Sequence, residues 1–198
     1  MMLCSIIAVN NEGFGNGVTA TWIATDMKPG DEKTFGLEEV RLAKEIGSIE
    51  ADHTEITCNY NVIEESPQTE SDTDPNTNLD PDKMAKEMLI TRCVYHDIVC
   101  IDCLTGIKWS GYNYTSGVCA GTNLGQSNDW KIEDKNGDGK ISFYDLKNDK
   151  LDNLPAVQNS PPFSFKMGVK FSETAGNDFQ GDIFDLTMIF RLNQDASQ

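Results

Sequence analysis

The sequence predicts an all-β protein, a jelly-roll-type β-sandwich with long loops and an N-terminal extension. Three observations predict it. Apolar residues recur with a period of two in several segments, turn-forming residues separate those segments, and the chain has the length of one domain. With 198 residues it is long enough to bury a core of its own. We therefore divide it into an arm and hinge at residues 1–17 and one domain at residues 18–198.

Three segments alternate apolar and polar residues clearly enough to be assigned as strands. They are residues 163–171, which follow the turn signal Pro161-Pro162, residues 184–192, and residues 56–62. Because alternate side chains of a strand point to opposite faces, each segment has one buried face. Cys58 belongs to the inward-facing set of its strand.

The remaining segments give weaker signals. Residues 37–49 fit a short helix nearly as well as a strand, and residues 84–103 are expected to begin with a helical turn and continue as a strand. Residues 64–82 are polar and rich in turn formers, so we expect an exposed loop there. A second long connection, rich in glycine, is expected at residues 110–128.

The charge of the chain excludes two classes of partner. Acidic residues number 32 and Lys plus Arg 16, which gives a net charge of −16. A chain this acidic repels nucleic acid and anionic lipid headgroups. No segment has the length and apolar character of a membrane-spanning helix, so we expect no membrane span.

The six cysteines indicate disulfides and an extracellular, cell-surface location, because disulfides persist in oxidising compartments. The disulfide candidates are Cys4, Cys58, Cys93, Cys100, Cys103 and Cys119, and the sequence leaves their pairing open. The alternative is a zinc site formed by Cys93, His96, Cys100 and Cys103. Alternation along a strand would send these four side chains to different faces, so we favour disulfides.

The first nine residues are apolar but do not form an intact signal peptide. They contain no basic residue, and they lead directly into the polar residues Asn10, Asn11 and Glu12. We expect that a signal peptide has already been removed from the secreted chain.

The most specific local motif is a calcium loop at residues 134–145. Asp134, Asn136 and Asp138 supply side-chain oxygens at positions one, three and five, and Gly139 takes the sharp turn at position six. Lys140 supplies a backbone carbonyl at position seven, and Asp145 closes the loop at position twelve. We predict that these residues bind calcium in a structural role. The alternative is a solvated turn without metal.

No catalytic motif is present, so we do not expect an enzyme. The chain has two histidines and lacks the zinc-protease helix motif, the nucleophile elbow and the phosphate-binding glycine loop. Asn113 begins an Asn-Tyr-Thr triplet in an expected surface loop and is a candidate for N-glycosylation.

Several short motifs resemble the TasA/camelysin family, which includes biofilm-fibre subunits and the archaeal bundling-pilus proteins similar to them. Residues 27–31 (MKPGD) resemble the turn that precedes a strand in that family, and residues 47–49 (GSI) resemble the segment that follows. Residues 134–146 resemble the acidic loop of archaeal members. Residues 177–182, leading into a strand that ends at residues 192–194, resemble the closing signature of the family.

The resemblance implies a structural subunit of a pilus-like or biofilm-matrix filament, a head-to-tail homopolymer whose subunits join by donor-strand complementation. In that arrangement the apolar arm, with Leu3, Ile6, Ile7 and Val9, completes the sheet of the next subunit, and the glycine-rich residues 13–17 form the hinge. Two alternatives stay open for the arm, which could fold back onto its own chain or be cleaved.

The alternative function is a monomeric secreted module that binds a cell-surface partner in the presence of calcium. The aromatic residues Trp109, Tyr112, Tyr114 and Trp130 would serve such binding, and they suit a core or an interface equally well.

Overall fold

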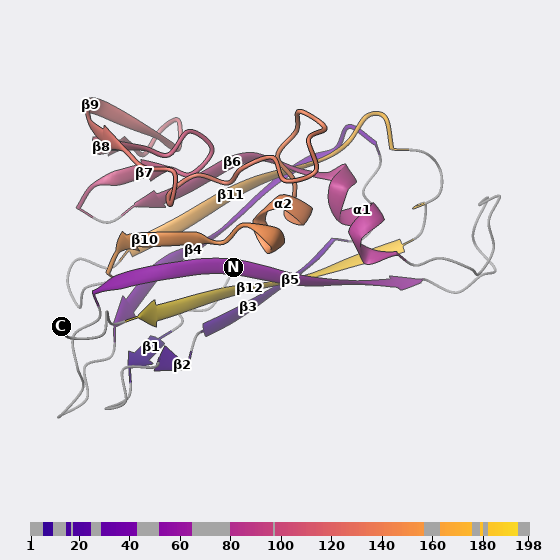
Figure 1. Cartoon of the computed structure of the whole chain (residues 1–198), viewed down its shortest axis with the longest axis horizontal. Coiled ribbons are helices and arrows are strands. Elements are labelled where there is room, and N and C mark those ends of the chain that lie inside the picture. The colour runs from indigo at the N-terminus through magenta and orange to yellow at the C-terminus, as the bar shows by residue number, and fades with distance from the viewer. Residues whose placement is uncertain are drawn as a thin grey trace.

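The structure is a computed structural model and consists of two packed β-sheets with two short helices that contact both of them (Figure 1). It describes residues 6–9, 15–16, 18–24, 29–42, 52–64, 80–96, 98–156, 163–175, 179 and 182–193. The prediction of an all-β sandwich is confirmed.

The larger sheet has eight strands. Their order across the sheet is β2 (Gly15–Asn16), β1 (Ile6–Val9), β4 (Glu32–Leu42), β11 (Phe163–Phe171), β6 (Met88–His96), β7 (Cys100–Asp102), β8 (Ile107–Asn113) and β9 (Val118–Gln126). The smaller sheet has the order β10 (Leu151–Pro155), β5 (His53–Glu64), β12 (Asp182–Asn193) and β3 (Val18–Ala24). All described pairings are antiparallel except that of β1 with β4.

Much of the chain moves back and forth between the two sheets. Strand β3 lies in the smaller sheet, β4 in the larger, β5 in the smaller and β6 in the larger, and β10, β11 and β12 alternate in the same way. These consecutive strands therefore lie in opposite layers, whereas β1 pairs with β2, and β6, β7, β8 and β9 pair in chain order within one sheet. This connectivity holds the two layers together along their whole length.

The core lies between the sheets and is formed by the alternating residues of the three strands that the sequence predicts best. Phe165 of β11 and Phe190 of β12 meet across the interface edge to face, with ring centroids 5.2 Å apart. The buried set of these strands comprises Ile56, Cys58, Tyr60, Val62, Phe165, Met167, Val169, Phe171, Phe184, Leu186, Met188, Phe190 and Leu192. Burial of each large apolar side chain contributes about 1.5–3 kcal/mol, so these strands supply much of the stability.

Helices α1 (Pro81–Glu87) and α2 (Phe143–Asn148) pack against each other and against β5 and β6, one strand of each sheet. Helix α1 begins where the Asp80 carboxylate accepts a hydrogen bond from the backbone N–H of Asp82, at 3.0 Å, with Pro81 in the first turn. Met84 and Ala85 bury its inner face. The expected helical turn before a strand at residues 84–103 is confirmed, because α1 leads directly into β6.

The prediction of a long connection at residues 110–128 is wrong, because this segment completes β8 and forms β9. The two strands make a hairpin in which Tyr112 lies opposite Cys119. Strand β9 is largely exposed, so its sequence lacks the alternation by which a half-buried strand is recognised. Gly121 adopts a φ of +98°, and a Cβ there would lie 2.4 Å from the Oγ of Ser110, so only glycine suits this position.

The other weak assignments are resolved in part. Residues 37–42 belong to strand β4, which settles the choice between helix and strand for that stretch, while residues 43–49 lie outside the described residues. The expected loop at residues 64–82 lies mostly outside them as well. At its C-terminal end, helix α1 begins at Pro81.

A buried carboxylate anchors the far ends of β5, β12 and β10. Glu55 is almost fully buried, and its two oxygens bind the Lys150 ammonium at 2.5 Å and the Arg191 guanidinium at 2.7 Å. Burial alone would raise the pKa of Glu55, but the hydrogen bonds and charges of these two cations outweigh it and hold the pKa below its ordinary value.

We expect Glu55→Gln to destabilise the protein by about 1 kcal/mol at pH 7, because both cations are half exposed and regain water. A carboxyl whose pKa is lowered by folding stabilises the fold above its unfolded pKa and loses that contribution as the pH falls. The difference between wild type and variant should therefore shrink below about pH 4.3. Urea unfolding of both proteins at pH 7 and pH 3 measures it, and an equal difference at both pH values would contradict the assignment.

Candidate functional site

The predicted calcium loop, residues 134–145, lies between β9 and α2 and is held by its own side chains. The Asp134 carboxylate accepts hydrogen bonds from the backbone N–H groups of Gly137 at 2.7 Å, Asp138 at 3.2 Å and Gly139 at 2.7 Å. Asp134 is thus the organising residue of the turn.

The second half of the turn repeats the pattern. The side-chain oxygen of Asn136 accepts from the Asp138 N–H at 3.0 Å, and Asp138 accepts from the Lys140 N–H at 2.8 Å. Gly137 and Gly139 have φ values of +74° and +80°, in the left-handed region that side chains disfavour. The backbone conformation therefore favours glycine at both positions, and the motif predicts the glycine at position 139.

Asp145 joins the loop to helix α2 and is completely buried. Its Oδ2 accepts hydrogen bonds from the backbone N–H of Ser142 at 2.8 Å and from the Ser142 hydroxyl at 2.7 Å. Its Oδ1 accepts from the Lys135 N–H at 2.8 Å. This carboxylate therefore caps the helix and also closes the loop.

The loop has the ligand types that calcium prefers, in the right order. Asp134, Asn136, Asp138 and Asp145 offer side-chain oxygens, and Lys140 offers its carbonyl. In this structure both oxygens of Asp134 and both of Asp145 are engaged in hydrogen bonds to the chain. Within the described residues, no three Asp, Glu, His or Cys side chains gather closely enough to hold a metal ion. Each ionised carboxylate has about four acceptor sites, so these hydrogen bonds do not by themselves exclude a cation.

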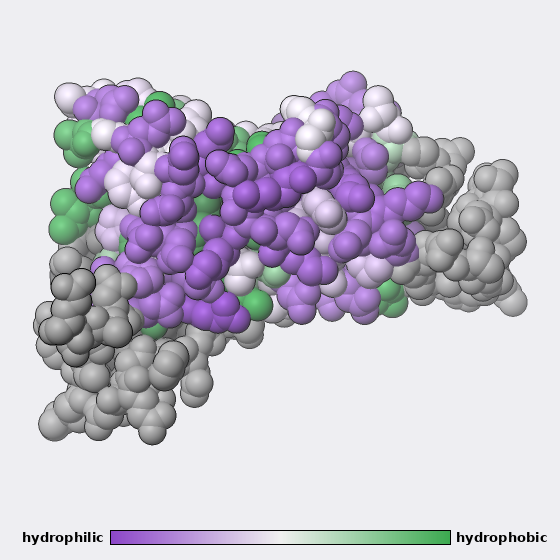
Figure 2. All heavy atoms as spheres, in the orientation of Figure 1, coloured by the Kyte–Doolittle hydropathy of each residue, from purple (hydrophilic) through white to green (hydrophobic). Residues whose placement is uncertain are grey.

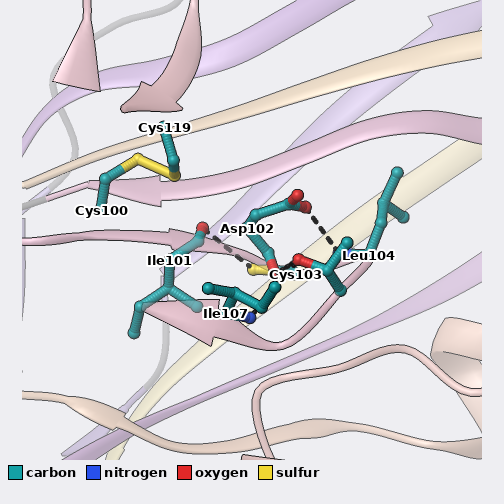
Figure 3. Close-up of a disulfide and its surroundings, with 8 residues drawn as sticks. Cys100, Ile101, Asp102, Cys103, Leu104, Ile107 and Cys119 are labelled. Carbon is teal, nitrogen blue, oxygen red and sulfur yellow. Dashed lines mark hydrogen bonds between the residues drawn. A yellow bond between two sulfur atoms is a disulfide. The ribbon is translucent and has the colours of Figure 1, made fainter. Parts of the chain in front are cut away.

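One disulfide joins Cys100 of β7 to Cys119 of β9, with Cα atoms 5.3 Å apart (Figure 3). Strand β8 lies between these two strands in the sheet order, so the bond spans a strand. The β8–β9 hairpin must curl back over β7 to permit it, and the register shifts at Lys108 to Gly111 provide the bend. The disulfide fixes the curled edge of the larger sheet.

The four residues of the alternative zinc site are not brought together. Cys100 is consumed by the disulfide, and the His96 ring stacks on Tyr112 with centroids 4.6 Å apart. Cys93 and Cys103 are completely buried as thiols. Strand alternation sends the side chains of these four residues to different faces of the sheet, as expected.

The third described thiol, Cys58, is inert by its surroundings. It lies on β5 in the core, and its Sγ donates to the carbonyl of Phe143 at 3.6 Å. Burial raises the pKa of the Cys58 thiol to about 12, so almost no thiolate forms at neutral pH. Cys4 lies outside the described residues.

Two of the predicted aromatic residues, Tyr112 and Tyr114, form a surface cluster with His96, a contact that the sequence does not predict. Tyr112 and Tyr114 contact each other edge to face at 5.0 Å, and both pack against His96. Burial and the positive charge of Lys166 lower the pKa of His96. The tyrosines are visible as an alternating pair in the sequence, but their contact with His96 depends on the pairing of distant strands.

Tyr114 is 78% exposed, and Ile98 and Val118 are also exposed at the same end of the hairpin strands. Figure 2 shows a mostly hydrophilic face with hydrophobic residues at the end that carries β7, β8 and β9. Trp130, by contrast, packs on the core, and its indole N–H donates to the carbonyl of Asn153 at 2.8 Å. Only part of the predicted aromatic set is therefore free to contact a partner.

Asn113, the glycosylation candidate, ends strand β8 and is exposed. Its side-chain oxygen accepts from the N–H groups of Thr115 at 2.9 Å and Ser116 at 3.1 Å. The residue lies at a surface turn, as the sequence predicts.

The N-terminal arm forms strand β1 and lies beside β4 of its own chain. Ile6 pairs with Arg41 and Ile7 with Leu42, and Val9 pairs with Gly15 of β2. Leu3 lies outside the described residues. The donor role of the arm in a neighbouring subunit stays a prediction.

A scan of the chain against models of known protein families finds no match, and a search of curated proteins finds no match either. Among the helices of the described residues, neither is long and apolar enough to cross a membrane.

Proposed function

We propose that the protein is a secreted structural subunit of an extracellular filament, pilus-like or part of a biofilm matrix, that polymerises head to tail by donor-strand complementation. The observation that supports it is the open edge of β4. Strand β11 pairs with β4 from Glu32 to Val40, but on the other edge the described strands offer only β1, which pairs at Arg41 and Leu42.

An edge of this length is a template for another strand. Between Glu32 and Val40 no described strand pairs with this edge, so its N–H and C=O groups can hydrogen-bond to an extended segment, and proteins use such edges to bind peptides and partner chains. Strand β1 is held in its own chain by two paired positions to β4 and two to β2, so few strand pairings are lost when it leaves. Exchange of an identical segment between copies is a low-cost route to assembly.

In the proposed filament the arm of one subunit, with Leu3, Ile6, Ile7 and Val9, lies along β4 of the next. The glycine-rich residues 13–17 give the arm the freedom to reach it. Each contact is head to tail and does not close, so it propagates into a fibre. The jelly-roll connectivity, the calcium loop and the disulfide belong to the same proposal as devices that stabilise each subunit outside the cell.

We expect the full chain to form fibres and a chain lacking residues 1–12 to remain monomeric, because deletion removes the donor strand. Negative-stain imaging of both proteins, each with calcium and with a chelator, tests this. Fibres from the truncated chain would contradict donor-strand assembly. A loss of fibres from the full chain with chelator alone would assign the loop at residues 134–145 a role in assembly.

A cross-link separates exchange between subunits from folding back of the arm. Ile6→Cys with Arg41→Cys, in a Cys4→Ser background, places two thiols at facing positions of β1 and β4. On a denaturing gel, oxidised fibres should give a ladder of covalent oligomers, and reduction should convert this ladder to monomers. Linked monomers alone would show that each arm stays on its own chain, and Ile6→Cys without its partner is the matched control.

The aromatic cluster favours a second candidate function, a monomeric module that binds a carbohydrate in a calcium-dependent way. Exposed tyrosines stack on sugar rings, and Tyr114 is held in place by Tyr112 and His96. If this is correct, Tyr114→Ala should weaken binding of a soluble polysaccharide about tenfold. Leu124→Ala, another exposed apolar residue of the hairpin, should leave the affinity unchanged.

A further inference from the structure

Cys93 of β6 and Cys103, the residue that follows β7, lie directly opposite each other. The register pairs Tyr95 with Ile101 and Val94 with Asp102, and the next pair along these strands is Cys93 with Cys103. The backbone N–H of Cys103 donates to the carbonyl of Cys93 at 2.8 Å. The two cysteines are therefore a hydrogen-bonded pair of an antiparallel ladder.

This geometry suits a disulfide. In such a pair the Cα atoms are about 5.5 Å apart, within the range of about 4.4–6.8 Å that disulfides span. Opposed residues of a ladder project from the same face of the sheet. Both side chains are completely buried, so the two sulfur atoms share one small region of the core. Burial raises the pKa of Cys93, and a hydrogen bond between the two thiols raises it further.

We propose that Cys93 and Cys103 form a second disulfide, which joins β6 to β7. The oxidant is an external disulfide such as glutathione disulfide. One cysteine thiolate attacks it, forms a mixed disulfide and releases one glutathione thiol. The second cysteine then attacks the mixed disulfide and releases the other glutathione thiol. The two protein thiols lose two electrons and two protons in total, and the oxidant gains them.

Among the described cysteines, this pairing is the one that the fold favours. Cys100 is already bonded to Cys119, and Cys58 lies on the opposite sheet, where its thiol donates to the carbonyl of Phe143. With both bonds present, β6 is linked to β7 and β7 to β9. Three strands of the curled edge then form one covalent unit, and β8 is held within it.

Because both thiols are buried, the bond must form while the chain folds or opens locally. The test is therefore to refold the reduced full chain with a mixture of reduced and oxidised glutathione. Remaining thiols are then alkylated in denaturant, and the protein is digested with trypsin and a protease that cleaves before aspartate. This digestion places each of Cys93, Cys100, Cys103 and Cys119 on a separate peptide, namely residues 93–96, 97–101, 102–108 and 109–128.

We expect peptides 93–96 and 102–108 to be recovered linked, and the peptide that carries Cys58 to be recovered alkylated. Recovery of Cys93 and Cys103 as alkylated thiols, in protein whose Cys100–Cys119 bond has formed, would overturn the proposal. So would a bond from either residue to Cys58.

Two variants guard against a failure of refolding. Cys58→Ser leaves the proposed pair intact and should not change the linked peptides. Cys103→Ser removes the second attacking thiol, so Cys93 should be recovered as a thiol or as a glutathione adduct. If Cys93 of that variant instead bonds fully to Cys58, the pairing is not set by the ladder and the proposal fails.

Discussion

Asp145→Ala is expected to destabilise the domain by about 3 kcal/mol, even without calcium. The substitution removes the acceptor of three hydrogen bonds from a site with no access to water and leaves the Ser142 and Lys135 N–H groups without their partner. Each buried donor that loses its partner costs about 1–3 kcal/mol, and loss of a helix cap costs about 1 kcal/mol. Urea unfolding of the full chain in the presence of a chelator measures the effect.

Asp138→Ala is the matched control for this prediction. Asp138 belongs to the same loop but is exposed, and it accepts one backbone hydrogen bond from Lys140. We expect Asp138→Ala to lower the free energy of unfolding by less than about 1 kcal/mol without calcium. If the loop binds calcium, both variants should lose binding in a calcium titration. Equal destabilisation by the two variants would show that the buried position of Asp145 has no special role.

Phe184→Ala is expected to cost about 4 kcal/mol, because it opens a cavity where β12, β5 and helix α2 meet. The ring is completely buried and lies 5.5 Å from the ring of Tyr60 and 5.7 Å from that of Phe143, measured between centroids. Phe143 is the first residue of α2, so the ring also supports the helix that carries Asp145.

Chemical denaturation of Phe184→Ala, Phe184→Leu and Thr187→Ala tests this in a graded way. Leucine refills part of the cavity, so Phe184→Leu should lower the free energy of unfolding by about 1–2 kcal/mol. Thr187 lies on the outward face of the same strand, so Thr187→Ala should lower it by about 0.5 kcal/mol or less. A cost for Phe184→Ala no greater than that for Thr187→Ala would contradict its place in the core.

The strands with one buried face could be predicted from the sequence because burial imposes the alternation that is read there. This is why β5, β11 and β12 were predicted with nearly correct bounds. Strand β9 is not predicted because it is held by its pairing with β8 and by the Cys100–Cys119 disulfide. Neither interaction produces a periodic pattern in the sequence.

The candidate site could be predicted only where it depends on residues that are close together in the sequence. The loop at residues 134–145 is local, so ligand order and glycine positions were readable in sequence. The second role of Asp145, as a buried helix cap, depends on where α2 packs. The opposition of Cys93 and Cys103 depends on strand register, which six cysteine positions alone do not determine.

The position of β12 between β5 and β3 sets the order in which the protein can fold. Trp22 of β3 pairs with Leu186, and Tyr60 of β5 pairs with the same residue from the other side. Neither early strand has this partner until β12 has been synthesised, so the smaller sheet stays without its centre while the rest of the chain emerges. Contacts so distant in sequence also form slowly. The chain therefore passes through a stage in which the inner faces of its early strands are exposed, and under the proposed secretion it would complete its core after translocation.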